Sequence, residues 1–178
     1  MPERRGTPAL IAAGLALGTL AVFWPATSAQ FVNYDDNIYV TENAPVKAGL
    51  TAEGVRWAFT TFRAGNWHPL TWISHMADVS MWGIGPWGHH LTSVGLHAVN
   101  VALVFLVLAR ATGAAGLAAA AAALFGLHPL RVESVAWVAE RKDVLSAAFG
   151  LAAILVYVLW TEKPSKGRFA GMLGLYAL

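Results

Sequence analysis

The chain of 178 residues contains no cysteine, and only 12% of its residues carry a charge. Without cysteine there is no disulfide framework, no thiolate metal site and no cysteine nucleophile. Soluble domains carry about 25% charged residues, so this shortage of charge argues against an ordinary soluble domain. The net charge is only +2, too small to indicate a nucleic-acid-binding surface, and we expect no nucleic-acid partner.

Apolar residues are correspondingly abundant, at 57% of the chain. A helix needs about 17–25 mostly apolar residues to cross a bilayer. Five segments approach that requirement: residues 8–24, 91–109, 111–127, 144–160 and 169–178, the last of which is truncated by the end of the sequence. The sequence therefore predicts an all-α, polytopic transmembrane protein, and we expect it to be the N-terminal part of a longer one.

The distribution of lysine and arginine predicts the orientation of these spans. Six of the 12 cations lie in the short segments 1–7, 110–115 and 161–168, and the other six are spread over the much longer loops 25–90 and 128–143. Because cytoplasmic loops are enriched in cations, we expect a cytoplasmic N-terminus and both long loops outside. The alternative for the first segment is a signal peptide with Glu3-Arg4-Arg5 as its basic region.

The first outer loop, residues 25–90, is too long for a simple connector. Residues 51–62 are predicted to form a short helix with Thr51 as its N-cap, and residues 67–82 a second helix with Pro69 near its start. We expect the first helix to lie flat in the membrane interface. The face that would contact lipid consists of Val55, Ala58, Phe59 and Phe62.

Two adjacent carboxylates, Asp35 and Asp36, follow the first span by about ten residues. Close to the membrane surface, such a pair suits a general base or a cation ligand. The alternative is purely structural, because Asn33 and Asn37 flank the pair and together they could form a turn in which side chains bind the backbone. The residues alone leave both interpretations open.

The second outer loop, residues 128–143, offers three cations at the bilayer surface: Arg131, Arg141 and Lys142. Arginine binds phosphate through two parallel hydrogen bonds, so a phosphate is a natural partner. His128 and Glu133 lie in the same loop, and Glu133 could orient Arg141. The equally weighted alternative is a helix entry stabilised by its own ion pairs, such as Arg131 with Glu133, and anchored by its cations.

Several motifs, in order along residues 30–145, resemble those of one family. They are Phe31–Asn43, which contains the acidic pair, then His68–Trp72, Gly88–Leu91, His97–Asn100, Leu124–Glu133 and Val138–Leu145. Together they resemble the transmembrane and tetratricopeptide-repeat-containing O-mannosyltransferases and their bacterial relatives. This resemblance implies the GT-C class of membrane glycosyltransferases and a multi-pass protein of the bacterial inner membrane.

The resemblance also implies a reaction. The donor would be a polyprenyl-phosphate-linked sugar such as mannose, and the acceptor a protein Ser/Thr hydroxyl or another acceptor on the extracytoplasmic face. Asp35 and Asp36 would be catalytic, and a divalent cation held by Asp35, Asp36 and His68 is considered. The residues expected to bind substrate are His68, His128, Arg131, Glu133, Arg141 and Lys142. His68 stands where animal members carry arginine, which bears on the donor sugar and on how its phosphate is held.

Two rival functions are weighed against catalysis. The first is a non-catalytic membrane anchor for a tetratricopeptide-repeat interaction domain, which would tolerate loss of Asp35 and Asp36. The second is a piece of a transporter. The predicted spans lack the intramembrane charges and broken helices that transporters use, which argues against the second rival.

Overall fold

The computed structural model describes residues 7–178, and within that range the chain is helical and contains no strand. The prediction of an all-α protein is thereby confirmed. The chain divides into two compact units. Unit 1 consists of the described part of Met1–Val22 with Gly95–Arg131 and Ser146–Leu178, and unit 2 of Phe23–Val94 and Val132–Leu145.

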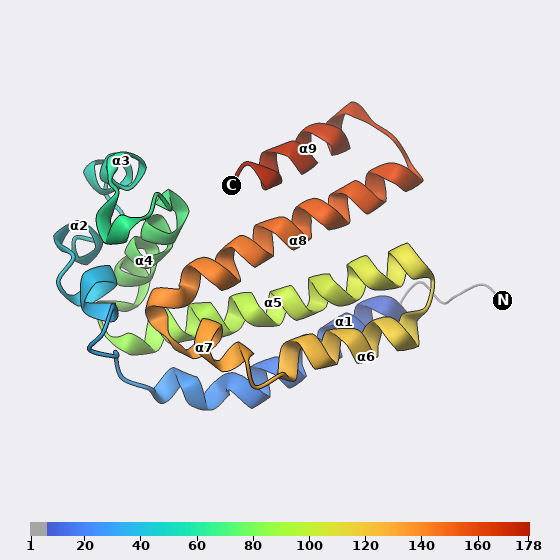
Figure 1. Ribbon diagram of the computed structural model, residues 1–178, viewed down its shortest axis with the longest axis horizontal. Helices are drawn as coiled ribbons and strands as arrows, with labels where there is room; N and C mark the ends of the chain where they lie inside the picture. Colours follow the sequence, from blue (N-terminus) through green and yellow to red (C-terminus); the bar gives the residue numbers. More distant parts are fainter. Residues whose placement is uncertain (1–6) are drawn as a thin grey trace. The chain divides into compact units, whose positions relative to one another are not determined.

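Within residues 7–178, three helical segments are long and apolar enough to cross a membrane (Figure 1). The first comprises α1 (Thr7–Phe23) and the 3₁₀ turn η1 (Trp24–Ser28). The second is α5 (Pro86–Thr112), and the third comprises η4 (Val138–Glu140) and α8 (Arg141–Glu162). Helices lie at the predicted spans 8–24, 91–109 and 144–160, as expected of a polytopic membrane protein.

The segment predicted as a span at residues 111–127 forms a shorter helix. Gly113, with a φ of +69°, separates α5 from α6 (Ala115–Leu127), which therefore has only 13 residues. At a rise of about 1.5 Å per residue, 13 residues extend about 20 Å against a hydrocarbon core of about 30 Å. The segment predicted from residue 169 belongs to α9 (Lys166–Tyr176), which folds back beside α8 (Figure 1).

The core of unit 1 joins α1, α5 and α6. Its buried members are Ala12, Val101, Phe105, Ala118 and Ala122. Gly126 near the end of α6 lies so close to α5 that a methyl group on it would approach Val101 Cγ2 to 2.6 Å. At the opposite end of α5, Arg110 pairs with Glu162 at the end of α8, with 3.1 Å between Nη1 and Oε2.

Unit 2 contains the short helices of the first outer loop. They are η2 (Asn37–Thr41), α2 (Ala44–Lys47), α3 (Ala52–Thr60), η3 (Arg63–Gly65) and α4 (Pro69–Trp82), and α7 (Arg131–Ala136) reaches this unit from the second loop. Val46, Ala58, Trp72 and Met76 form its core with Val138 and Ala139. Since residues 25–90 and 128–143 both contribute to one core, the second segment holds the first in place.

Both helices predicted in the first outer loop are confirmed. The Thr51 hydroxyl caps α3 by accepting a hydrogen bond from the Gly54 amide at 3.0 Å, and Pro69 is the first residue of α4. The expected lipid-facing side of α3 is wrong in one respect. Ala58 is buried inside unit 2, whereas Phe59 and Phe62 are exposed, so these residues do not share one surface.

Candidate functional site

The two carboxylates of the acidic pair occupy different environments. Asp36 is fully buried, and both of its oxygens accept hydrogen bonds from backbone amides, Oδ2 from Val32 at 2.7 Å and Oδ1 from Ala139 at 2.9 Å. The second bond links residues 103 positions apart in the sequence. Asp36 therefore makes one local side chain–backbone bond, of the kind a turn uses though not with Asn33 or Asn37, and one bond that ties residues 25–90 to residues 128–143.

Asp35 is half-buried, and its side chain makes no hydrogen bond or ion pair within residues 7–178. A π-helical turn, η2, begins two residues later at Asn37. Single π-helical turns are uncommon and frequent at functional sites. Of the two carboxylates, Asp35 is the one whose oxygens remain accessible to a substrate hydroxyl.

Four partly exposed polar side chains lie around the buried Tyr39. We call the group the Tyr39 cluster and define it as Asp35, Tyr39, His68, Glu140 and Lys142. The Lys142 ammonium lies 2.6 Å from a Glu140 oxygen and 5.9 Å from the centre of the Tyr39 ring. Burial raises the pKa of Tyr39, Lys142 lowers it, and Glu140 and Asp35 raise it further, so that the phenol stays protonated at neutral pH.

His68, at the N-terminus of α4, completes the Tyr39 cluster. Its ring stacks on Tyr39 with centroids 5.6 Å apart and an interplanar angle of 17°, and its centroid is 4.7 Å from that of Trp72. Burial, and to a smaller extent the charge of Lys142, lower the pKa of His68. The imidazole is therefore neutral at pH 7 and offers a hydrogen-bonding edge rather than a charge.

A second set of polar residues is buried in unit 2. We call it the Arg141 cluster and define it as His75, Asp78, His89, Ser93 and Arg141, all of them fully or almost fully buried. The Arg141 guanidinium pairs with Asp78 and donates to the His89 carbonyl and, at 3.3 Å, to the Ser93 hydroxyl. The sequence places Arg141 at the outer surface, and the structure corrects this by burying it against a carboxylate 63 positions away.

Hydrogen bonds and the charge of Arg141 keep its ion-pair partner, Asp78, in the charged form. Burial raises the pKa of Asp78, but the hydrogen bond from His89, the charge of Arg141 and the hydrogen bond from Thr92 together outweigh burial and lower it. The pKa of His75 is far below its ordinary value because of burial and then the charge of Arg141. The cluster is thus an Asp–Arg ion pair flanked by a neutral His75.

Ligand atoms of His75, Asp78 and His89 lie within 4.8 Å of one another, a grouping that a metal ion can use. The two Nδ1 atoms of the histidines are 3.2 Å apart. Arg141 already occupies the single carboxylate, and a divalent cation would leave this buried group with a large excess of positive charge. The residues fit an ion pair better than a metal.

The three metal ligands considered from the sequence suit a metal ion no better. Asp35, Asp36 and His68 do not form a group with converging ligand atoms among the described residues. Both oxygens of Asp36 already accept backbone hydrogen bonds. We therefore assign no role to a metal ion held by these three residues.

Three further residues predicted to bind substrate make their contacts outside both clusters. His128 is exposed, and its Nδ1 accepts a hydrogen bond from the Leu130 amide at 3.3 Å. Arg131 places its guanidinium 4.5 Å from the Phe125 ring centre within unit 1. Glu133 is exposed and, within residues 7–178, forms no ion pair with Arg131 or Arg141, so neither arrangement expected of it is observed.

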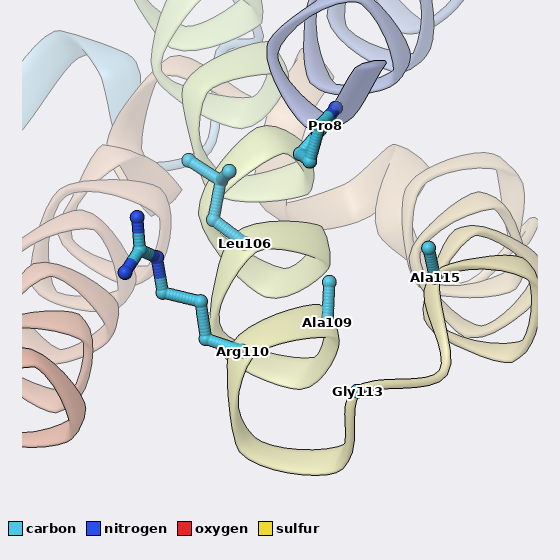
Figure 2. Close-up of a pocket in the computed structure, with 6 residues that line it drawn as sticks. All are labelled: Pro8, Leu106, Ala109, Arg110, Gly113 and Ala115. Carbon is cyan, nitrogen blue, oxygen red and sulfur yellow. The ribbon is translucent and has the colours of Figure 1, made fainter. Parts of the chain in front are cut away.

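Unit 1 contains a cavity of about 360 Å³ where α5 turns into α6 (Figure 2). Its lining includes Pro8, Leu106, Ala109 and Ala115. In Figure 2 the Arg110 side chain points away from Ala115, and its guanidinium is paired with Glu162. This cavity presents mainly alkyl groups and offers little for the chemistry of a sugar or a phosphate.

Asp78 and His89 are two members of the Arg141 cluster that the sequence analysis does not identify. His75 and Asp78 are three positions apart, so both fall on one face of α4. That spacing indicates a buried polar cluster, because an aspartate beside a histidine on the apolar face of a helix needs a buried partner. The partner itself comes from another part of the sequence.

The Tyr39 cluster brings carboxylate, amine and imidazole groups together in a chain whose described part has three helices long and apolar enough to cross a membrane, as in an integral membrane protein. Comparison with known proteins identifies its relatives. The chain is 39% identical over 93 residues to Protein O-mannosyl-transferase Tmtc1 of Drosophila melanogaster, covering 52% of the chain and 11% of that protein. It is 32% identical over 141 residues to Tmtc2 of the same species, covering 73% of the chain and 15% of the relative.

The mouse protein named Protein O-mannosyl-transferase TMTC1 matches almost the whole chain, with 28% identity over 180 residues that cover 94% of the chain and 19% of the relative. The chain is a relative of the TMTC protein O-mannosyl-transferases. It spans only 11–19% of the length of these three proteins. No protein-family model matches the sequence, and no solved structure matches it.

Proposed function

We propose that the chain is the N-terminal part of a GT-C-like transmembrane domain in a membrane glycosyltransferase. The enzyme would move a sugar, with mannose the first to test, from a polyprenyl phosphate to a protein Ser/Thr hydroxyl. The observation that carries this proposal is the similarity to proteins named O-mannosyl-transferases over up to 94% of the chain. The accessible carboxylate and amine of the Tyr39 cluster supply the groups that such a reaction needs.

Asp35 is the general base in this proposal. Its carboxylate accepts the proton of the acceptor hydroxyl while the hydroxyl oxygen attacks the anomeric carbon. The bond from that carbon to the phosphate oxygen breaks, the polyprenyl phosphate departs with the bonding electron pair, and the configuration of the sugar inverts. Asp36 acts as a positioning residue, because its two backbone hydrogen bonds fix the loop that carries Asp35.

Lys142 stabilises the departing phosphate. Its side chain is 32% exposed and therefore accessible to an anion, whereas the side chain of Arg141 is fully buried. A fixed cation is most effective where negative charge develops during the reaction. The neutral imidazole of the half-buried His68 provides a further hydrogen bond to the sugar or the phosphate.

We place the Tyr39 cluster on the extracytoplasmic side. The support is the distribution of cations within unit 1, where the Arg110–Glu162 pair brings the end of α5 to the end of α8, near Lys163 and Lys166. That basic end is the cytoplasmic one by the rule for positive loops. Arg4 and Arg5, on which the predicted orientation also rests, lie outside the described residues.

The test is sugar transfer by the full-length protein in proteoliposomes. The substrates are a polyprenyl-phosphate-linked mannose and a Ser/Thr-rich peptide, and the variant is Asp35→Asn. Loss of a general base lowers turnover about 10²- to 10⁴-fold, and the melting temperature stays unchanged because the Asp35 side chain makes no hydrogen bond or ion pair within the described residues. Normal transfer by Asp35→Asn would favour the rival function, a non-catalytic anchor for an interaction domain.

A further inference from the structure

We propose that Phe59, Phe62 and Trp67 form an aromatic tip of unit 2 that inserts into the lipid head-group region of the bilayer. The exposed fractions of these residues are 49%, 71% and 56%. Three large aromatic side chains within nine residues form a concentration of exposed apolar surface of the kind that marks interaction sites. This inference does not depend on the proposed glycosyltransferase activity.

The aromatic tip is held in place by the fold. The Trp67 indole N–H donates to the Phe59 carbonyl at 3.0 Å, so the polar edge of the indole is satisfied and its apolar ring faces outward. The rings of Phe59 and Trp67 meet edge to face with centroids 6.5 Å apart. Two of the three side chains are therefore fixed to one another.

The turn that presents Phe62 is held just as firmly. Ala64 and Gly65 both have positive φ angles, 60° and 74°, and Ala64 takes up this conformation at an energetic cost. Arg63 keeps the turn in place by donating to the carbonyls of Ile38 at 3.1 Å and Glu42 at 3.3 Å. Contacts on the inner side of the turn thus hold Phe62 away from the core.

The charges around the aromatic tip favour lipid as its partner. Arg56 and Arg63 are exposed beside it, and residues 55–70 contain no aspartate or glutamate. Aromatic rings with arginines around them match the membrane interface, where the rings enter the acyl boundary and the cations meet lipid phosphates. The partner is therefore the surface of an anionic bilayer, and three helices within the described part of this chain are long and apolar enough to cross such a bilayer.

The absence of cysteine allows a single probe to test the inference. Phe62→Cys and, as a second position, the exposed Thr60→Cys are labelled with the fluorophore NBD in the chain reconstituted into phosphatidylcholine–phosphatidylglycerol vesicles. We expect blue-shifted emission, quenching by lipids that carry a nitroxide on the acyl chain, and loss of quenching by aqueous iodide. Glu53→Cys in the exposed first turn of α3 is the matched control, and we expect iodide to quench it.

Two results would overturn the inference. Quenching of both tip labels by iodide would place the aromatic tip in water. Protection from iodide without quenching by the nitroxide lipids would mean that protein covers the tip, either a further segment of a longer chain or a second copy. Because only fluorescence is measured, neither result depends on whether the protein transfers sugar.

Discussion

The Tyr39 cluster and the Arg141 cluster both combine carboxylates with a cation, but they differ in exposure. Lys142 and Glu140 retain 32% and 20% of their side-chain exposure, whereas Arg141 and Asp78 retain 0% and 1%. Either member of an ion pair in contact with water can leave its partner and bind a ligand. Removing one member of a buried pair, in contrast, lowers the stability of the protein by several kcal/mol. In the proposed function, the exposed cluster therefore carries the chemistry and the buried cluster contributes stability.

The largest effect on stability is expected at the buried pair. Asp78→Asn leaves the Arg141 guanidinium buried without its counter-charge, and breaking such a pair costs about 3–5 kcal/mol. The free energy of unfolding in detergent measures it. The double variant Asp78→Asn/Arg141→Met removes the orphaned charge and should recover part of the loss; an Asp78→Asn protein as stable as the parent would show that the pair is not maintained.

A smaller loss is expected at Asp36. Asp36→Asn preserves size but turns one acceptor oxygen into a donor, which leaves the amide of Val32 or Ala139 unsatisfied at a cost of about 1–3 kcal/mol. The melting temperature should fall accordingly. Sugar transfer should fall less than in Asp35→Asn once the fraction of folded protein is taken into account. If Asp36→Asn instead lost transfer at full stability, the two carboxylates would have to exchange roles.

The next prediction is that stability depends on pH through the protonation of His75. Because burial and Arg141 hold its pKa far below the ordinary value, the native protein does not take up the proton that the unfolded chain binds below about pH 6.5. The contribution of His75 to stability is therefore complete above about pH 6.5 and decreases below it by at most about 1.4 kcal/mol per pH unit. Melting curves between pH 7.5 and 5 should show this slope, and His75→Gln should reduce it.

Asp78 serves as the internal comparison for the pH experiment. Its lowered pKa means that its contribution is present above the ordinary carboxyl range and is lost only as the pH falls below about 4. The interval from pH 5 to 6.5 therefore separates the histidines from Asp78, and because the pKa of His68 is lowered too, the difference in slope between the parent and His75→Gln measures His75. An equal slope in the parent and in His75→Gln would show that His75 is accessible to protons in the native state.

The smallest effect on stability is expected at Lys142. Lys142→Met breaks a partly exposed ion pair, which contributes about 0–1 kcal/mol. Donor use should suffer more, because a hydrogen bond to a charged group contributes about 1.5–3 kcal/mol, which corresponds to roughly a tenfold or greater rise in donor KM. Arg141→Lys, which retains the charge inside the buried cluster, is the comparison variant; an unchanged donor KM in Lys142→Met would remove this residue from the site.

Local signals predicted the short helices well. The cap at Thr51 and the start of α4 at Pro69 depend on residues within one turn, so the sequence contains all the information that determines them. The length of α6 was missed for an equally local reason. Gly113 ends the preceding helix in a left-handed conformation, which leaves too few residues for a full span.

The site was less predictable because its decisive contacts are distant in the sequence. The run from Glu140 to Asp143 has the pattern of a charged surface, and only Asp78, 63 positions earlier, shows that Arg141 is buried. In the same way, Ala139 determines the role of Asp36 from 103 positions away. A sequence pattern identifies the residue types that suit a reaction, but burial separates those that can meet a substrate from those that hold the loops.

The division of roles between the two clusters is tested most directly by measuring transfer rate and melting temperature together on Asp35→Asn and Asp78→Asn in the full-length protein. Both substitutions exchange one carboxylate for its amide, so size and shape are matched. We predict that Asp35→Asn loses transfer at an unchanged melting temperature, whereas Asp78→Asn melts earlier and its remaining folded fraction transfers sugar. The reverse pattern, with Asp35→Asn unstable and Asp78→Asn stable but inactive, would contradict the account.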